Sequence, residues 1–127
     1  MSPSEMRALI DQYIEAYNNM DVAGMLLTVH PDVEFKNISE GTVNASANGV
    51  EELQALAEKS KSLFSERQQT ILAFETDENK AVASIAFRAV VAGDLPNGLQ
   101  KGQVLSLTGR SEFYFRDGRI FKITDIS

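Results

Sequence analysis

Cysteine is absent from this chain of 127 residues, and histidine occurs only once, at His30. The lack of cysteine excludes disulfides, thiolate zinc sites and cysteine nucleophiles. A single histidine without neighbours at ligand spacing makes no metal site. The sequence also has no G-x-S-x-G nucleophile motif and no glycine-rich loop that would cradle a phosphate. We therefore expect neither a metal nor another cofactor.

Long apolar runs and an excess of positive charge are missing as well. No apolar stretch approaches the roughly 20 residues that cross a bilayer, and the N-terminus lacks the basic and then apolar pattern of a secretory signal. The net charge of −6 argues against nucleic acid or an anionic membrane as a partner. These features predict a cytoplasmic protein that binds neither.

The composition is that of a globular protein. With 127 residues and 43% hydrophobic residues, the chain can bury one core, and its size predicts a single domain over residues 1–127.

Apolar residues recur at helical spacing in three segments of the first half. A capping box, Ser2-Pro3-Ser4-Glu5, predicts the start of a first helix that ends near Asn18. A second helix with Val29 on its apolar stripe is expected between Asp21 and His30, and a third begins near Asn48 with Phe64 on its inner face.

The remaining segments show the patterns of strands and turns. Strands are predicted at 32–39, 67–76, 80–92, 100–116 and 119–126, while the Gly/Ser/Asn-rich stretch 40–49 is expected to be mostly loop with a short strand. This order predicts an α+β fold in which an antiparallel sheet packs on helices.

The alternation of side chains along these elements predicts which of them point inward. In "DVEFKNIS", Phe35 and Asn37 share the face of Val33, and in "SIAFRAVVA" Phe87 points inward, which turns Arg88 outward. Further inward positions come from the helices and from the strand 100–116: Tyr13, Tyr17, Leu56 and Phe113.

Three motifs carry a resemblance that covers nearly the whole chain. They are "YIEAYNNMD" at the end of the first helix, "HPDVEF" before the first strand, and "FRDGRIFKITDIS" as the terminal hairpin. Their order resembles the nuclear transport factor 2-like superfamily, which includes ketosteroid isomerase and the SnoaL-like polyketide cyclases. The resemblance implies a cone-shaped fold whose curved sheet and three helices enclose an apolar pocket, and usually a dimer.

The resemblance also implies positions for catalytic groups. Ketosteroid isomerase uses an Asp base, a tyrosine and a protonated Asp. By resemblance, Tyr13 stands at the tyrosine position, Asn37 at the base position and Ser111 at the position of the protonated Asp. A carboxamide cannot remove a proton from carbon, so this isomerase chemistry is not expected. The outward-facing Arg88 likewise leaves the triad of the related epoxide hydrolases unassembled.

One carboxylate, Asp125, remains as a candidate acid or base. The alternation in "GRIFKITDIS" leaves two possible inner faces, and the resemblance favours the one that carries Ile123 and Asp125. Burial in an apolar pocket would raise the pKa of Asp125 toward neutral pH. The alternative is a solvated Asp125 at the rim.

Three functions remain open at this stage. The first is a cofactor-independent isomerase, cyclase or hydrolase acting on an apolar ring compound. The second is a noncatalytic pocket protein that binds a small hydrophobic molecule. The third is an assembly domain that forms a homodimer through the outer face of its sheet. Val104 and Tyr114 are the candidate interface residues on that face. For the first, the predicted catalytic residues are Asp125 and Tyr13, and the predicted substrate-binding residues are Tyr17, Phe35, Asn37, Leu56, Phe87, Ser111 and Phe113.

Overall fold

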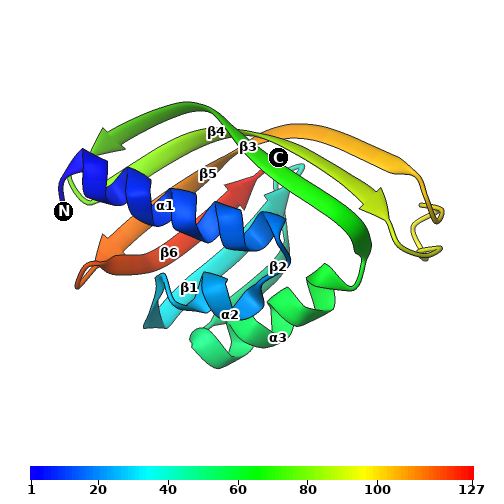
Figure 1. Cartoon of the computed structure of the whole chain (residues 1–127), viewed down its shortest axis with the longest axis horizontal. Helices are drawn as coiled ribbons and strands as arrows, with labels where there is room; N and C mark the ends of the chain where they lie inside the picture. The colour runs from blue at the N-terminus through cyan, green and yellow to red at the C-terminus, as the bar shows by residue number, and fades with distance from the viewer.

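The computed structural model describes all residues, 1–127, as three helices on one face of a curved six-stranded sheet (Figure 1). The strands lie in the order β2-β1-β6-β5-β4-β3. In chain order the elements are α1 (Pro3–Asn18), α2 (Val22–Leu26), β1 (Val29–Ser39), β2 (Thr42–Asn48), α3 (Val50–Lys61), β3 (Phe64–Asp77), β4 (Lys80–Val91), β5 (Val104–Arg116) and β6 (Arg119–Ile126).

The predicted α+β class is confirmed, with one difference in the sheet. Strands β1 and β6 pair in parallel, whereas all other neighbouring strands are antiparallel. The reason is topological. After the β1–β2 hairpin, α3 carries the chain to the far edge of the sheet, and the meander β3-β4-β5-β6 returns to β1 (Figure 1). Strand β3 starts at that edge in the direction opposite to β1, so the three reversals along the meander leave β6 parallel to β1.

The first helix begins where the sequence predicts. The Ser2 backbone N–H donates to Glu5 Oε1 at 2.9 Å, and the Glu5 N–H donates to Ser2 Oγ at 3.1 Å, which completes the capping box. The second helix is shorter than predicted, because it ends at Leu26 and Val29 already belongs to β1.

The stretch 40–49 is predicted to be mostly loop with a short strand; the strand is present, but it occupies most of the stretch. The stretch contains the seven-residue strand β2, and Ser39 pairs with Thr42 across a tight turn. Glu40 and Gly41 make that turn possible with φ angles of +52° and +78°. Pairing with β1 supplies backbone hydrogen bonds that outweigh the low strand propensity of the Asn and Ala residues of β2.

Two other boundaries also differ from the prediction. Phe64 is the first residue of β3 and not part of the inner face of α3. Strand β5 begins at Val104, four residues later than predicted, because the preceding segment turns at Gly102, whose φ is +85°.

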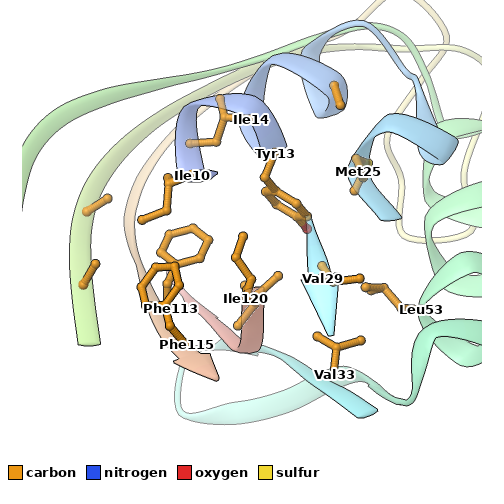
Figure 2. Close-up of a cluster of buried hydrophobic side chains, with 14 of the residues drawn as sticks. Ile10, Tyr13, Ile14, Met25, Val29, Val33, Leu53, Phe113, Phe115 and Ile120 are labelled. Atoms are coloured by element: carbon orange, nitrogen blue, oxygen red, sulfur yellow. The ribbon is translucent and has the colours of Figure 1, made fainter. Parts of the chain in front are cut away.

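The hydrophobic core fills one end of the space between α1 and the sheet. Figure 2 shows Ile10 and Ile14 of α1 facing Phe113 and Phe115 of β5 and Ile120 of β6. Phe113 is only 1% exposed. Each such fully buried side chain contributes about 1.5–3 kcal/mol to folding. At the other end, where α1 finishes, the same elements surround a cavity.

None of the three helices has the length and apolar character needed to span a membrane.

Candidate functional site

A cavity of about 320 Å³ lies between the C-terminal half of α1, α3 and the curved sheet. Thirteen of its 23 lining residues are hydrophobic, so its wall suits an apolar molecule with a few polar atoms. The core residues and the lining residues follow one another along the same strands. On β5, Phe113 belongs to the core and Ser111 to the cavity, and on β6 the corresponding pair is Ile123 and Asp125.

The structure brings eight of the nine predicted site residues to this cavity. They come from α1, β1, α3, β4, β5 and β6: Tyr13, Tyr17, Phe35, Asn37, Leu56, Phe87, Ser111 and Asp125. The ninth, Phe113, does not line the cavity. Its ring lies in the core and meets the Tyr13 ring edge-on, with 6.3 Å between the ring centroids (Figure 2). Alternation predicted its face correctly but not its depth, because Tyr13 and the rest of α1 cover it.

Three polar side chains lie side by side in the wall, one from each of three neighbouring strands. Asp125 of β6 is paired in register with Ser111 of β5 on one side and with Asn37 of β1 on the other. The buried Ser111 hydroxyl donates a hydrogen bond of 2.7 Å to Asp125 Oδ1. The carboxyl group is therefore held in one orientation by its neighbour.

Asp125 has an unusual protonation equilibrium for an aspartate. Burial raises its pKa from the ordinary 3.8 to about 6, although the hydrogen bond from Ser111 acts in the opposite direction. At pH 7 the carboxylate form of Asp125 dominates, and its protonated form lies only about 1.4 kcal/mol higher in free energy. A group with this balance can both accept and return a proton near neutral pH.

Asn37 lies one strand away from Asp125 with its amide already engaged. Its Nδ2 donates a hydrogen bond of 2.7 Å to Asn44 Oδ1 on β2. This bond orients the half-buried side chain in the cavity wall. The carboxamide has no titratable group, so a proton acceptor in this wall must come from β6 instead.

Tyr13 and Tyr17 project from successive turns of α1 into the same cavity. Burial raises the pKa of both phenols, and the neighbouring Asp125 raises each further. Both hydroxyl groups therefore stay protonated at any physiological pH, and each can donate a hydrogen bond to a ligand.

A lining residue that the sequence reasoning missed is Arg67 on β3. It is only 4% exposed, and its Nε donates a hydrogen bond of 2.9 Å to the carbonyl oxygen of Tyr17. Its guanidinium carbon lies 3.7 Å from the centroid of the Tyr17 ring. The available signal was alternation, because Arg67 has the same parity as Ile71 in the predicted strand 67–76 and therefore shares its inward face.

A match to a protein family agrees with this architecture. The model of the SnoaL-like domain matches residues 10–123. The chain belongs to this family. The nuclear transport factor 2-like superfamily, to which the sequence motifs pointed, is thereby confirmed for this SnoaL-like domain.

Solved structures with the same fold cover 98% of the SnoaL-like domain chain. A candidate polyketide cyclase from Xanthomonas campestris pv. campestris is 21% identical, with a TM-score of 0.83 and 91% of that chain covered. AclR, a candidate hydroxylase from Streptomyces galilaeus, is 22% identical, with a TM-score of 0.78 and 89% covered. TerC, co-crystallised with polyporic acid, is 18% identical, with a TM-score of 0.78 and 91% covered. At these identities the likeness establishes the fold alone. None of the curated proteins matches significantly.

No cluster of three or more His, Cys, Asp or Glu side chains in the SnoaL-like domain is arranged to hold a metal ion. The polar groups of the cavity are instead the Asp125 carboxyl, two phenols, the two arginines Arg67 and Arg110, and neutral hydroxyl and amide groups. Such a set can bind an apolar molecule by its polar end and exchange a proton with it.

Proposed function

We propose that this SnoaL-like domain binds an apolar ring compound and acts on it as a cofactor-independent enzyme, with Asp125 as acid and base. The observation that carries the proposal is the Asp125–Ser111 pair in an apolar cavity, where the pKa of the carboxyl group is about 6. Strongly shifted carboxyl groups in clefts are characteristic of catalytic acids and bases.

In the proposed reaction, the Asp125 carboxylate removes a proton from a carbon next to a ligand carbonyl. The electron pair of the broken C–H bond moves to the carbonyl oxygen and forms an enolate, and the Tyr13 hydroxyl donates a hydrogen bond to that oxygen. Protonated Asp125 then returns the proton to the same or a conjugated carbon. Tyr17, Asn37 and Ser111 orient the polar end of the ligand.

The apolar residues of the site would hold the ring itself. Phe35, Leu56 and Phe87 come from three different elements and line the same cavity. TerC, which has this fold, was crystallised with polyporic acid, and this supports a small organic molecule as the ligand class.

Deuterium exchange into 2-tetralone tests the proposal, because this bicyclic ketone needs only proton removal and return. In D₂O near neutral pD, wild-type protein should exchange the α-protons faster than buffer, as followed by proton NMR. Asp125→Asn should reduce the protein-dependent rate by roughly 10²-fold or more, the usual contribution of a positioned base. Asp32→Asn, at an exposed site outside the cavity, is the matched control.

Equal exchange rates for wild type and Asp125→Asn would end the catalytic proposal. The second candidate, a noncatalytic pocket protein, would then be favoured. Asn37 supports that candidate, since it places an amide where the related isomerase has its base.

We also propose that the domain forms a homodimer through the outer face of its sheet. Val104 is 51% exposed there, and Tyr114 on the same strand is half-buried, with the amines of Lys80 and Lys122 at 5.3 and 5.5 Å from its ring centroid. Glu112 also lies on this face, next to Lys80. A twofold axis brings the same patch of two copies together, so a lysine of one copy can face Glu112 of the other while the apolar groups meet.

Light scattering at micromolar concentration should give twice the chain mass of 14.0 kDa. Val104→Glu should shift the protein toward the monomer, because it buries a charge in the proposed interface. Leu27→Glu changes another exposed apolar residue, next to α2, and should leave the dimer intact. A monomeric wild-type protein would refute the dimer.

A further inference from the structure

Arg67 is a buried cation with hydrogen-bond donors that the protein does not use. Its Nη2 atom is buried and has no hydrogen-bond partner, although only 4% of the residue is exposed. A buried charged group without a full set of partners is costly for folding. Stability therefore does not explain why an arginine occupies position 67.

One part of its environment has a structural explanation. Tyr17 lies in the last turn of α1, and its carbonyl oxygen accepts the hydrogen bond from Arg67 Nε. A cation at the C-terminal end of a helix is stabilised by the helix dipole. This accounts for Nε, but it leaves Nη2 without an acceptor.

The guanidinium group is held firmly in place. It stacks on the Tyr17 ring at 3.7 Å. The adjacent inward residue of β3, Gln69, is joined to the end of α1 by two hydrogen bonds: its backbone N–H donates to Asn18 Oδ1 at 2.7 Å, and its carbonyl oxygen accepts from Asn18 Nδ2 at 3.1 Å. The donors of Arg67 are therefore oriented before any ligand arrives.

No carboxylate of the protein neutralises Arg67. The ion pairs of the structure involve other side chains, at the surface, and Asp125, the carboxylate of the cavity, bonds to Ser111 instead. The cavity thus contains Arg67 and Asp125, which do not pair with each other, while its other arginine, Arg110, is exposed and pairs with Glu112. The charges of both Arg67 and Asp125 act on the phenols of Tyr13 and Tyr17, which line the same cavity.

We propose that Arg67 binds an oxyanion of the ligand, so that the substrates are apolar ring compounds carrying a carboxylate or an ionised phenol or enol. Guanidinium donors suit such oxygens because they bond to them with charge assistance and often in pairs. The oxyanion would stand at Arg67 while the reacting carbon stands at Asp125. This inference rests on the ligand cavity of the proposed function and specifies its substrate class.

The test compares anionic probes with neutral probes of similar shape at pH 8. The pairs are 2-naphthoate with 2-acetonaphthone, and 4-nitrophenolate with 4-nitroanisole, which distinguish a carboxylate from a phenolate. Wild-type protein should bind at least one anion roughly tenfold to a hundredfold more tightly than its neutral partner in calorimetric titration, as expected for charge-assisted hydrogen bonds.

Arg67→Met should remove this preference by weakening anion binding at least tenfold, while neutral binding changes less than threefold. Arg67→Lys keeps the charge without the planar fork and should retain part of the preference. Arg88→Met removes the same charge from the exposed outer side of β4 and should leave the preference unchanged. The preference of the wild type is informative by itself if a variant fails to fold.

The inference is overturned if neither anion binds wild-type protein more tightly than its neutral partner, or if Arg67→Met weakens both members of a pair equally. Its failure can be separated from failure of the proposed catalysis. Asp125→Asn should lose exchange of 2-tetralone yet keep the anion preference, whereas intact exchange without an anion preference would refute only the role of Arg67.

Discussion

Replacing Asp125 with asparagine is expected to stabilise the protein by up to about 3 kcal/mol at pH 8 and to change its stability little at pH 4. The folded protein holds the Asp125 proton up to a pKa of about 6, whereas an unfolded chain releases it near 3.8. Between these values the folded state binds more protons, so the stability decreases as pH rises, and the full loss is present above pH 6. At about 1.4 kcal/mol per pKa unit, the difference amounts to about 3 kcal/mol.

Asparagine has nearly the same shape and lacks the charge. Its Oδ1 can still accept the hydrogen bond from the Ser111 hydroxyl. Urea unfolding of wild type and Asp125→Asn at pH 4 and pH 8 measures the effect, with the exposed Asp32→Asn as the matched control. A gain in stability that is the same at both pH values would show that Asp125 is not protonated in the folded state at mild acidity. A variant that is more stable but catalytically inactive would mark Asp125 as retained for function.

Truncating Phe113 to alanine is expected to destabilise the protein by about 3–5 kcal/mol. The ring is 1% exposed and packs against Tyr13 of α1 and Ile123 of β6, so its removal leaves a hole within the core. Phe87 is a matched control, because it is also a phenylalanine on the inner face of the sheet. It lies half-buried in the wall of the cavity, and its ring already faces open space.

Phe87→Ala should therefore cost less stability than Phe113→Ala and should weaken ligand binding more. Thermal or urea unfolding of both variants, with binding of the aromatic probes named above, measures the two effects. Equal losses of stability for the two variants would contradict the assignment of Phe113 to the core and Phe87 to the cavity.

Local patterns explain why much of the architecture could be predicted from the sequence. The capping box at Ser2 depends on contacts within four residues, and alternation in β1 and β4 depends on neighbours in the same strand. The faces predicted for Phe35 and Phe87 were correct for this reason. Strand β2 was underestimated because its stability comes from pairing with β1 and not from its own composition.

The cavity residues show more clearly that local patterns cannot predict features that depend on distant parts of the chain. Parity places Ser111 and Phe113 on one face of β5, but only the position of α1 decides that Ser111 meets the cavity and Phe113 the core. Arg67 looked like the polar start of a strand. Its importance appears only when β3 brings it against the end of α1, about 50 residues earlier in the chain.

Most helices and strands, the inward faces of β1 and β4, the lack of thiol and histidine-cluster chemistry, and the family motifs could be derived from the chain alone. These properties follow from residue types and from spacings of two to four residues. The tertiary structure decided the parallel pairing of β1 with β6, the depth of each inward residue, and the meeting of Asp125 with Ser111. It also decided the protonation of Asp125, because desolvation depends on everything packed around the carboxyl group and not on its neighbours in the chain.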